Sequence, residues 1–242
     1  MRQSRIYTPQ ALAPADTVEV QGAASHYLAR VLRLSMGDPV TLFNGDGRDY
    51  QGEICQLQRH TAIVRVVDSR NPGNESPLKI TLVQAISRGE RMDYSLQKAT
   101  ELGVFCIQPV ISSRVEVRLD DARQVKRLSH WQGVVISACE QSGRATVPEV
   151  KTPLSLDKWM EVADESPRLV LEPAAVIKMS SFSITGGAVS ILVGPEGGFT
   201  DEELERARSA GVTPVSFGPR ILRTETAGPA AIAVLQSMAG DA

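Results

Sequence analysis

The stretch ILVGPEGGFTDEEL, residues 191–204, joins an apolar β-branched run to a Gly-Pro-Glu-Gly-Gly turn and then to a helix start. Glycines between a strand and a helix allow a ligand to come close to the backbone. Thr200 followed by Glu203 has the spacing of a capping box, so a helix is predicted from residue 200. A strand, a turn and a helix in this order are typical of an α/β domain with a parallel sheet.

The turn does not match the common phosphate-binding motifs. It lacks the Lys-Ser/Thr pair of a P-loop, and it lacks the G-x-G-x-x-G spacing of a dinucleotide-binding fold. The carboxylates of Asp201, Glu202 and Glu203 already fill the N-terminus of the predicted helix, where a phosphate would meet like charge. The ligand predicted for this turn is therefore a molecule without phosphate groups.

A second turn of this kind, FGPRILRTETAGPAA at 217–231, follows another apolar run. Ligands of parallel α/β sheets bind beyond the carboxyl ends of the strands, so two such turns can offer backbone groups to one compact molecule. One Gly-Pro pair alone would more simply make a tight turn. Two loops, the second carrying Arg220 and Arg223, favour a ligand site.

The chain is predicted to divide at DSRNPGNESPLK, residues 68–79, whose composition is typical of a linker. Before the linker, a helix is predicted at 25–34 and short strands at 40–44, 50–54 and 61–67, which together indicate a small barrel or half-open sheet. After it, strands are predicted at 79–86, 104–112, 168–172, 188–194 and 212–218, and helices at 91–103, 121–141, 200–211 and 226–238. The predicted domains are 1–72 and 73–242.

Composition excludes several classes of protein. With 242 residues, 42% of them hydrophobic, and a net charge of −2, the chain is ordinary for a globular protein and has no global basic field. The three cysteines form no C-x-x-C pair, so neither a disulfide framework nor a zinc site is predicted. No apolar run reaches membrane-spanning length and the N-terminus lacks the apolar stretch of a signal peptide, so a cytoplasmic protein is expected.

The two loops resemble the signature motifs of one family. LVGPEGGFTDEEL and FGPRILRTETA are similar to those of the RsmE-type 16S rRNA (uracil-N3)-methyltransferases, members of the SPOUT superfamily. Phe217 stands where the family often has Leu, which is expected to change the packing of the pocket rather than its chemistry. Further similar stretches cover nearly the whole chain: RIY (5–7), HYLARVLRL (26–34), SRGERMDYSLQKATELG (87–103) and ACEQSGR (138–144).

The resemblance implies an α/β fold, with a C-terminal SPOUT-type α/β domain containing a deep trefoil knot and a small N-terminal PUA-like β-barrel domain. It also implies a homodimer that binds S-adenosylmethionine (SAM) in the knot and methylates N3 of one uridine in the decoding region of 16S rRNA in the small ribosomal subunit. Neither a membrane, nor DNA, nor a metal is expected to take part. Two alternatives stay open: a SPOUT methyltransferase acting on another rRNA or tRNA site, and a non-catalytic RNA-binding factor.

SAM carries no phosphate and needs close backbone approach, apolar walls and a few polar groups. The predicted catalytic residues are Arg223, a cation that would stabilise the developing uracil anion, Arg220, on substrate phosphate or the same ring, and Glu196. Which group accepts the N3 proton is left open. The residues predicted to bind SAM are Leu171, Glu172, Gly194, Pro195, Glu196, Gly197, Gly198, Phe217, Gly218, Ile221, Leu222 and Thr226.

Arginines predict the RNA surface, because arginine suits phosphate recognition better than lysine and residues 1–72 contain no lysine. His26, Arg30 and Arg33 at i, i+4 and i+7 would share one stripe of a helix, which is either a solvated face, favoured from spacing alone, or a phosphate-contacting edge. The motif ACEQSGR is equally compatible with a plain helix end and with a role at the active site or dimer seam. The predicted RNA contacts are Arg2, Arg5, Arg30, Arg33, Arg88, Arg91 and Arg144.

Overall fold

The computed structural model describes residues 4–58, 60–115, 121–162 and 164–242, so Arg2 lies outside the described residues. The chain forms two compact units. The first combines Met1–Glu75 with Cys139–Val147, and the second combines Ser76–Ala138 with Pro148–Ala242. Composition along the chain cannot reveal a segment such as 139–147, which joins a unit far from it in sequence. The predicted boundary between residues 72 and 73 stays a prediction.

The first unit is built on a five-stranded sheet with the order β1-β3-β4-β5-β2. Only β1 and β3 are parallel, and the other neighbours are antiparallel. The register of β4 against β5 shifts twice, and such bulges bend a sheet and increase its twist. The strands are β1 (Arg5–Tyr7), β2 (Thr17–Gln21), β3 (Pro39–Phe43), β4 (Asp49–Leu57) and β5 (Thr61–Arg70).

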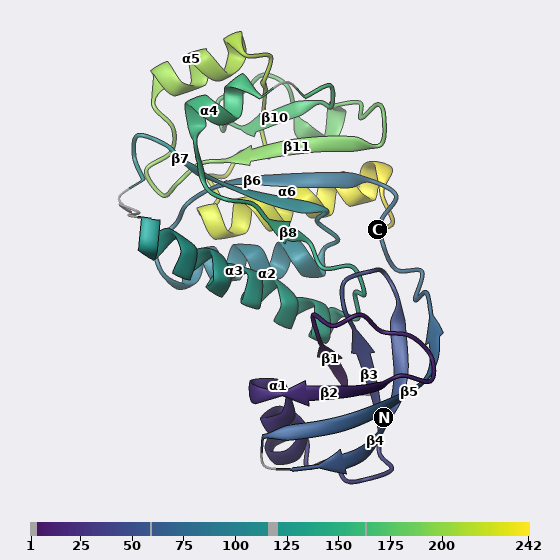
Figure 1. Ribbon diagram of the computed structural model, residues 1–242. Coiled ribbons are helices and arrows are strands. Elements are labelled where there is room, and N and C mark those ends of the chain that lie inside the picture. Colours follow the sequence, from purple (N-terminus) through teal and green to yellow (C-terminus); the bar gives the residue numbers. More distant parts are fainter. Residues whose placement is uncertain (1–3, 59, 116–120, 163) are drawn as a thin grey trace. The chain divides into compact units, whose positions relative to one another are not determined.

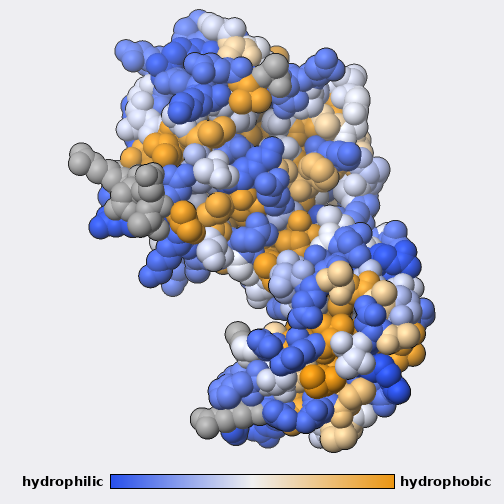
Figure 2. Space-filling model, viewed as in Figure 1, coloured by the Kyte–Doolittle hydropathy of each residue, from blue (hydrophilic) through white to orange (hydrophobic). Residues whose placement is uncertain are grey.

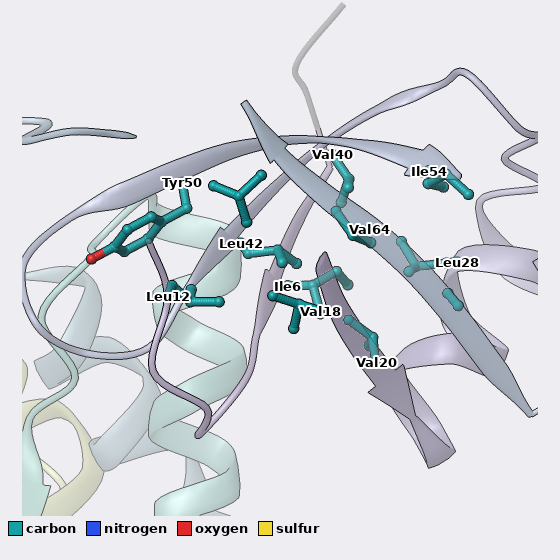
Figure 3. Close-up of a cluster of buried hydrophobic side chains, with 12 residues drawn as sticks. Ile6, Leu12, Val18, Val20, Leu28, Val40, Leu42, Tyr50, Ile54 and Val64 are labelled. Carbon is teal, nitrogen blue, oxygen red and sulfur yellow. The ribbon is translucent and has the colours of Figure 1, made fainter. Parts of the chain in front are cut away.

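Alternating apolar residues of these strands fill the core of the first unit. In β2, Val18 and Val20 are buried while their neighbours are exposed, as the two-residue period of a strand requires. Figure 3 shows their side chains gathered with those of Ile6, Leu28 and Val64. The predicted small barrel or half-open sheet is confirmed as a curled five-stranded sheet, and β1 and β2 are strands that the sequence pattern did not indicate.

The predicted helix 25–34 begins and ends three residues earlier than expected and is irregular. It consists of α1 (Gly22–His26) and one π-helical segment, η1 (Tyr27–Val31). Arg33 lies beyond η1 and has a positive φ of 53°. The single stripe predicted for His26, Arg30 and Arg33 is therefore wrong, because α-helical geometry does not extend over all three. Arg30 and Arg33 are nevertheless exposed.

Buried polar contacts hold the segment 139–147 within the first unit. The Arg5 guanidinium donates to Asp49 Oδ1 at 2.6 Å and to the carbonyl of Arg144 at 3.0 Å. The Arg144 guanidinium in turn pairs with Glu75 at 2.6 Å. Arg5 and Arg144, both predicted as RNA contacts, are thus buried in ion pairs, which favours a structural role for both.

The carboxylate of Glu140 belongs to the same cluster. It accepts a hydrogen bond from the amide of Tyr7 at 3.0 Å. Burial raises the pKa of Glu140, and the Tyr7 amide together with the charge of Arg5 opposes that rise only in part. These contacts favour a structural role for Glu140, and a role of the motif ACEQSGR at the active site or dimer seam stays a prediction.

Arg5→Leu is expected to lower the free energy of unfolding by about 3–5 kcal/mol, because Asp49 would remain a buried charge without its partner. Arg65→Leu is the matched control, since Arg65 and Glu53 form an ion pair of similar length in which both side chains are exposed. Urea unfolding followed by circular dichroism measures both variants. Equally small losses for the two would contradict a structural role for Arg5.

The second unit contains a parallel sheet, as predicted. The main order is β12-β10-β11-β6-β7-β8, with β9 also paired to β7, and every described pair is parallel. The trefoil knot implied by the resemblance stays a prediction. The strands are β6 (Lys79–Ala85), β7 (Cys106–Ile111), β8 (Glu149–Val150), β9 (Leu154–Ser155), β10 (Arg168–Leu171), β11 (Ala188–Val193) and β12 (Thr213–Val215).

Helices cover both faces of this sheet. Figure 1 shows α2, α3 and α6 grouped together, away from α4 and α5. On the face with α4 and α5, Trp159 and Ala207 pack in one cluster with Val83 and Leu192 of the strands. The helices are α2 (Glu90–Glu101), α3 (Asp121–Ser142), α4 (Leu156–Glu161), α5 (Asp201–Ser209) and α6 (Thr224–Ala239), and a 3-10 turn, η2, spans Met179–Ser181.

The surface is mixed in character. Hydrophilic and hydrophobic residues are interspersed over the visible face (Figure 2). No helix in the described part of the chain is long and apolar enough to cross a membrane. With a net charge of −2, an RNA surface must be a local patch of cations rather than a property of the whole protein.

Candidate cofactor and catalytic site

A cavity of about 490 Å³ lies at the carboxyl ends of β10, β11 and β12. Leu171 and Glu172 come from the end of β10, Gly194 follows β11, and Phe217 follows β12. The two glycine turns follow β11 and β12, which are not neighbours in the sheet because β10 lies between them. Both turns nevertheless line the same cavity. This position agrees with the general rule for ligand sites in open α/β sheets.

Most of the predicted site residues line this cavity. All three predicted catalytic residues are among them, and so are all the predicted SAM-binding residues except Gly197 and Thr226. Lining a cavity does not assign a role, so these roles stay predictions. The lining residues absent from the predicted SAM and catalytic set are Arg91, Pro173, Val193, Phe199, Thr224, Glu225 and Ala227.

Thr224, at the start of α6, ties the second loop to the first. Its hydroxyl donates to the carbonyl of Gly194 at 2.7 Å and accepts from the side-chain amide of Gln84 at 3.0 Å. Both side chains are buried, and buried polar groups that are paired in this way fix a single geometry. The spacing of residues in the sequence did not indicate a role for Gln84 at this site, because Gln84 is 140 residues from Thr224.

The first loop also requires its glycines. Gly198 has a φ of 68°, in the left-handed region that side chains with a Cβ rarely adopt. A Cβ on Gly194 would lie 3.2 Å from the ring of Phe199, which itself lines the cavity. The capping box predicted for the following helix is present, with Thr200 and Glu203 bonded reciprocally.

Glu196 is paired with the side chain of Arg91. The Arg91 guanidinium donates to Glu196 Oε1 at 2.8 Å, and the backbone amide of Arg88 donates to the same atom at 3.2 Å. Burial alone would raise the pKa of Glu196, but these hydrogen bonds and its own backbone amide outweigh burial and lower it. Arg91, predicted as an RNA contact, thus neutralises an acid in the cavity wall.

The second loop carries exposed groups at the cavity. Gly218 has a φ of 70°, and the Arg220 and Ile221 that follow are exposed. The Arg223 side chain is 79% exposed and lies 4.0 Å from Glu225, while its carbonyl accepts the amides that open α6. Arg223 is therefore a cation whose backbone is fixed at the start of α6 and whose side chain is largely exposed.

The donor groups fit a cofactor that is partly apolar and carries positive charge. Leu171, Val193 and Leu222 supply apolar surface, and the volume lies in the range of small-molecule sites, about 300–1,000 Å³. Glu172 lines the cavity and forms no ion pair within the described residues. An amino acid attached to a sulfonium and a nucleoside meets these requirements.

Two known families match the chain, and together they define its class as an RNA methyltransferase with a PUA domain. The family described as RNA methyltransferase domain matches residues 74–236, and the family described as RNA methyltransferase PUA domain matches residues 20–67. The chain is 35% identical to ribosomal RNA small subunit methyltransferase E of Buchnera aphidicola subsp. Schizaphis graminum, over 99% of this chain and 98% of that protein. It is 30% identical to the Bacillus subtilis protein of the same name, over 91% and 90% of the two chains.

Solved structures agree with these relatives. A Legionella pneumophila protein in complex with SAM shares 40% identity, with a TM-score of 0.96 and complete coverage of both chains. Ribosomal RNA small subunit methyltransferase E of Neisseria gonorrhoeae, bound to SAM, shares 41% identity, with a TM-score of 0.92 and 99% coverage of both chains. This chain belongs to the ribosomal RNA small subunit methyltransferase E family. The predicted family and enzyme class are confirmed.

Proposed function

We propose that the protein transfers a methyl group from SAM to N3 of a uridine in the decoding region of 16S rRNA. The observation that carries this proposal is the cavity at the ends of β10, β11 and β12, with the exposed cations Arg220 and Arg223 beside it. The relatives' names support small-subunit rRNA as the substrate, and their SAM complexes support the cofactor. The position N3 and the decoding region rest on the family resemblance.

SAM, when bound, supplies a methyl group activated by its sulfonium. Leu171 and Leu222 would enclose its apolar parts, and the backbone of the two loops would approach its polar edges. Glu172 is better placed than Glu196 to face a positive group or ribose hydroxyls, because Glu196 is already neutralised by Arg91. The predicted role of Glu196 then becomes support of the loop rather than direct chemistry.

On the RNA side, the residues must help uracil N3 lose its proton. The cation of Arg223 would stabilise the negative charge that develops on the ring, and Arg220 would hold a phosphate or the same ring. N3 is accessible only in an unpaired base, and holding it in line with the methyl group accelerates transfer further. Glu196 is a weak base because its pKa is lowered, so it is not our choice as proton acceptor.

The substrate surface and assembly complete the proposal. Arg30 and Arg33 in the first unit and Arg88 in the second are exposed and would contact phosphates. Residues 1–72 would dock the RNA and residues 73–242 would carry the chemistry. The protein would work as a homodimer in the cytoplasm, where its ribosomal substrate is found.

Mass spectrometry of 16S rRNA from strains with and without the gene tests this function. We expect one N3-methyluridine to disappear on deletion and to return on expression of the protein. A methyl group lost from another rRNA or a tRNA would favour the alternative substrate. Unchanged methylation of all RNA would favour a non-catalytic binding factor.

Gly198→Ala is expected to weaken SAM binding about 10-fold, because a Cβ strains the loop at a φ of 68° and changes the backbone offered to the cofactor. Gly211→Ala is the matched control: its φ is 81° and a Cβ there also has open space, but it lies away from the cavity. Calorimetry with SAM compares the two. Equal affinities would remove Gly198 from the site.

A further inference from the structure

An arginine outside the cavity holds the outer side of the first glycine loop. Arg114 follows β7, and its guanidinium donates to the carbonyl of Gly197 at 2.7 Å and to the carbonyl of Phe199 at 3.3 Å. Neither Arg114 nor Gly197 lines the cavity, whereas Gly198 and Phe199 do. The two carbonyls are thus bonded to a side chain that does not line the cavity.

The same two peptide groups are also bonded at their amide ends. The amide of Gly198 donates to the carbonyl of Pro195 at 2.9 Å, and the amide of Thr200 donates to Glu203 Oε2 at 2.9 Å. In a planar trans peptide the C=O and N–H point in opposite directions. The peptides 197–198 and 199–200 are therefore fixed at both ends.

The peptide between them is left for a ligand. Within the described part of the chain, no hydrogen bond is made by the carbonyl of Gly198 or the amide of Phe199. Both residues line the cavity. A peptide held between two fixed neighbours can turn only a little, so its donor and acceptor are oriented before a ligand arrives.

We infer that Arg114 is a positioning residue that presents the Gly198–Phe199 peptide to the cofactor. The inference rests on the proposed function, in which the cavity binds SAM. Arginine suits this role because its planar fork can reach two carbonyls, whereas lysine offers a single compact charge. Arg114 does not touch the reacting atoms, so it should govern cofactor affinity rather than the chemical step.

Gly197 supports the same arrangement. A Cβ on Gly197 would lie 3.4 Å from Cδ and 3.5 Å from Cβ of Arg114. Both distances are ordinary van der Waals contacts, so an alanine would fit beside the arginine stem, whereas a branched side chain would press on it. Gly197, predicted to bind SAM, thus packs against Arg114 and does not line the cavity.

The test is a series of full-length variants measured with SAM and with rRNA separately. Arg114→Ala is expected to raise both the Kd and the KM for SAM about 10-fold, because two charge-assisted hydrogen bonds are lost. Arg114→Lys should restore part of the affinity. The kcat at saturating SAM and the Kd for RNA should change less than about twofold, since neither depends on the loop once the cofactor is bound.

Two comparisons sharpen the test. Arg208→Ala removes an exposed arginine that pairs with Glu205 on α5, and it should leave the Kd for SAM unchanged. Gly197→Val should weaken SAM binding because its branched side chain presses on the stem of Arg114, and the double variant with Arg114→Ala should be less affected than the sum of both. Melting curves establish that each variant folds, and Arg114→Lys and Gly197→Val test the inference if Arg114→Ala does not fold.

Three results would overturn the inference. Unchanged SAM affinity in a folded Arg114→Ala protein would show that the arginine does not position the loop. Weaker RNA binding at unchanged SAM affinity would make Arg114 an RNA contact instead. Failure of the unaltered protein to bind SAM would refute the proposed function itself. This outcome differs from the other two because it is measured without any variant.

Discussion

Arg223→Ala is expected to slow methylation by about 100- to 1,000-fold while the Kd for SAM stays within about twofold. The large effect follows from the proposed partner, a negative charge on uracil that exists only as the methyl group is transferred. The small effect on SAM is expected because the Arg223 side chain, although it lines the cavity, is 79% exposed to solvent. Single-turnover methylation of small ribosomal subunits and calorimetry with SAM measure the two quantities.

Arg223→Lys keeps the positive charge and loses the planar fork of the guanidinium. It should therefore recover about a tenth of the methylation rate that Arg223→Ala loses. Arg206→Ala, which removes an exposed arginine of α5 paired at 3.4 Å with Asp157, controls for a general loss of surface charge. A normal rate in Arg223→Ala would remove the residue from the chemistry. A loss of SAM affinity equal to the loss of rate would make it a cofactor contact.

Removal of residues 1–72 is expected to abolish most methylation of small subunits, by about 100-fold or more, while SAM binding is retained. The cavity residues all lie in the second unit, which explains the retained affinity. The phosphate contacts proposed for Arg30 and Arg33 would be lost, and each such contact contributes salt-dependent affinity for RNA. Calorimetry with SAM and a methyl-transfer assay at several salt concentrations measure both effects.

The structure adds a condition to this experiment. Residues 139–147 pack with the first unit, so the truncated protein would expose Cys139 and leave the Glu140 carboxylate without the Tyr7 amide. A lower melting temperature is therefore expected even where the cavity stays intact. Arg30→Ala/Arg33→Ala in the full chain is the control, because it removes only exposed cations. Full methylation by the truncated protein would contradict a docking role for residues 1–72.

Local sequence patterns determined the elements that build the site. The capping box of Thr200 and Glu203 and the glycines of both loops act through backbone preferences within a few residues, so one strand–turn–helix unit suffices to predict them. The apolar runs of the parallel strands are equally local. A strand that is buried on both faces is apolar along its length, so its own residues are enough to predict it. The family resemblance then supplied what such patterns cannot contain, including the cofactor.

Tertiary structure alone decided which side chains meet. Arg91 and Glu196 are 105 residues apart, and Arg5 and the carbonyl of Arg144 are 139 apart, so no pattern of spacing connects them. An arginine on a predicted helix is compatible with a solvated face, an RNA contact or a buried ion pair, because its residue type is the same in all three. Burial and the nearest carboxylate distinguish these states, and both depend on how distant segments pack. For the same reason Arg114 could not be found from sequence: the carbonyls that it holds become neighbours only when β7 and β11 lie in one sheet with β6 between them.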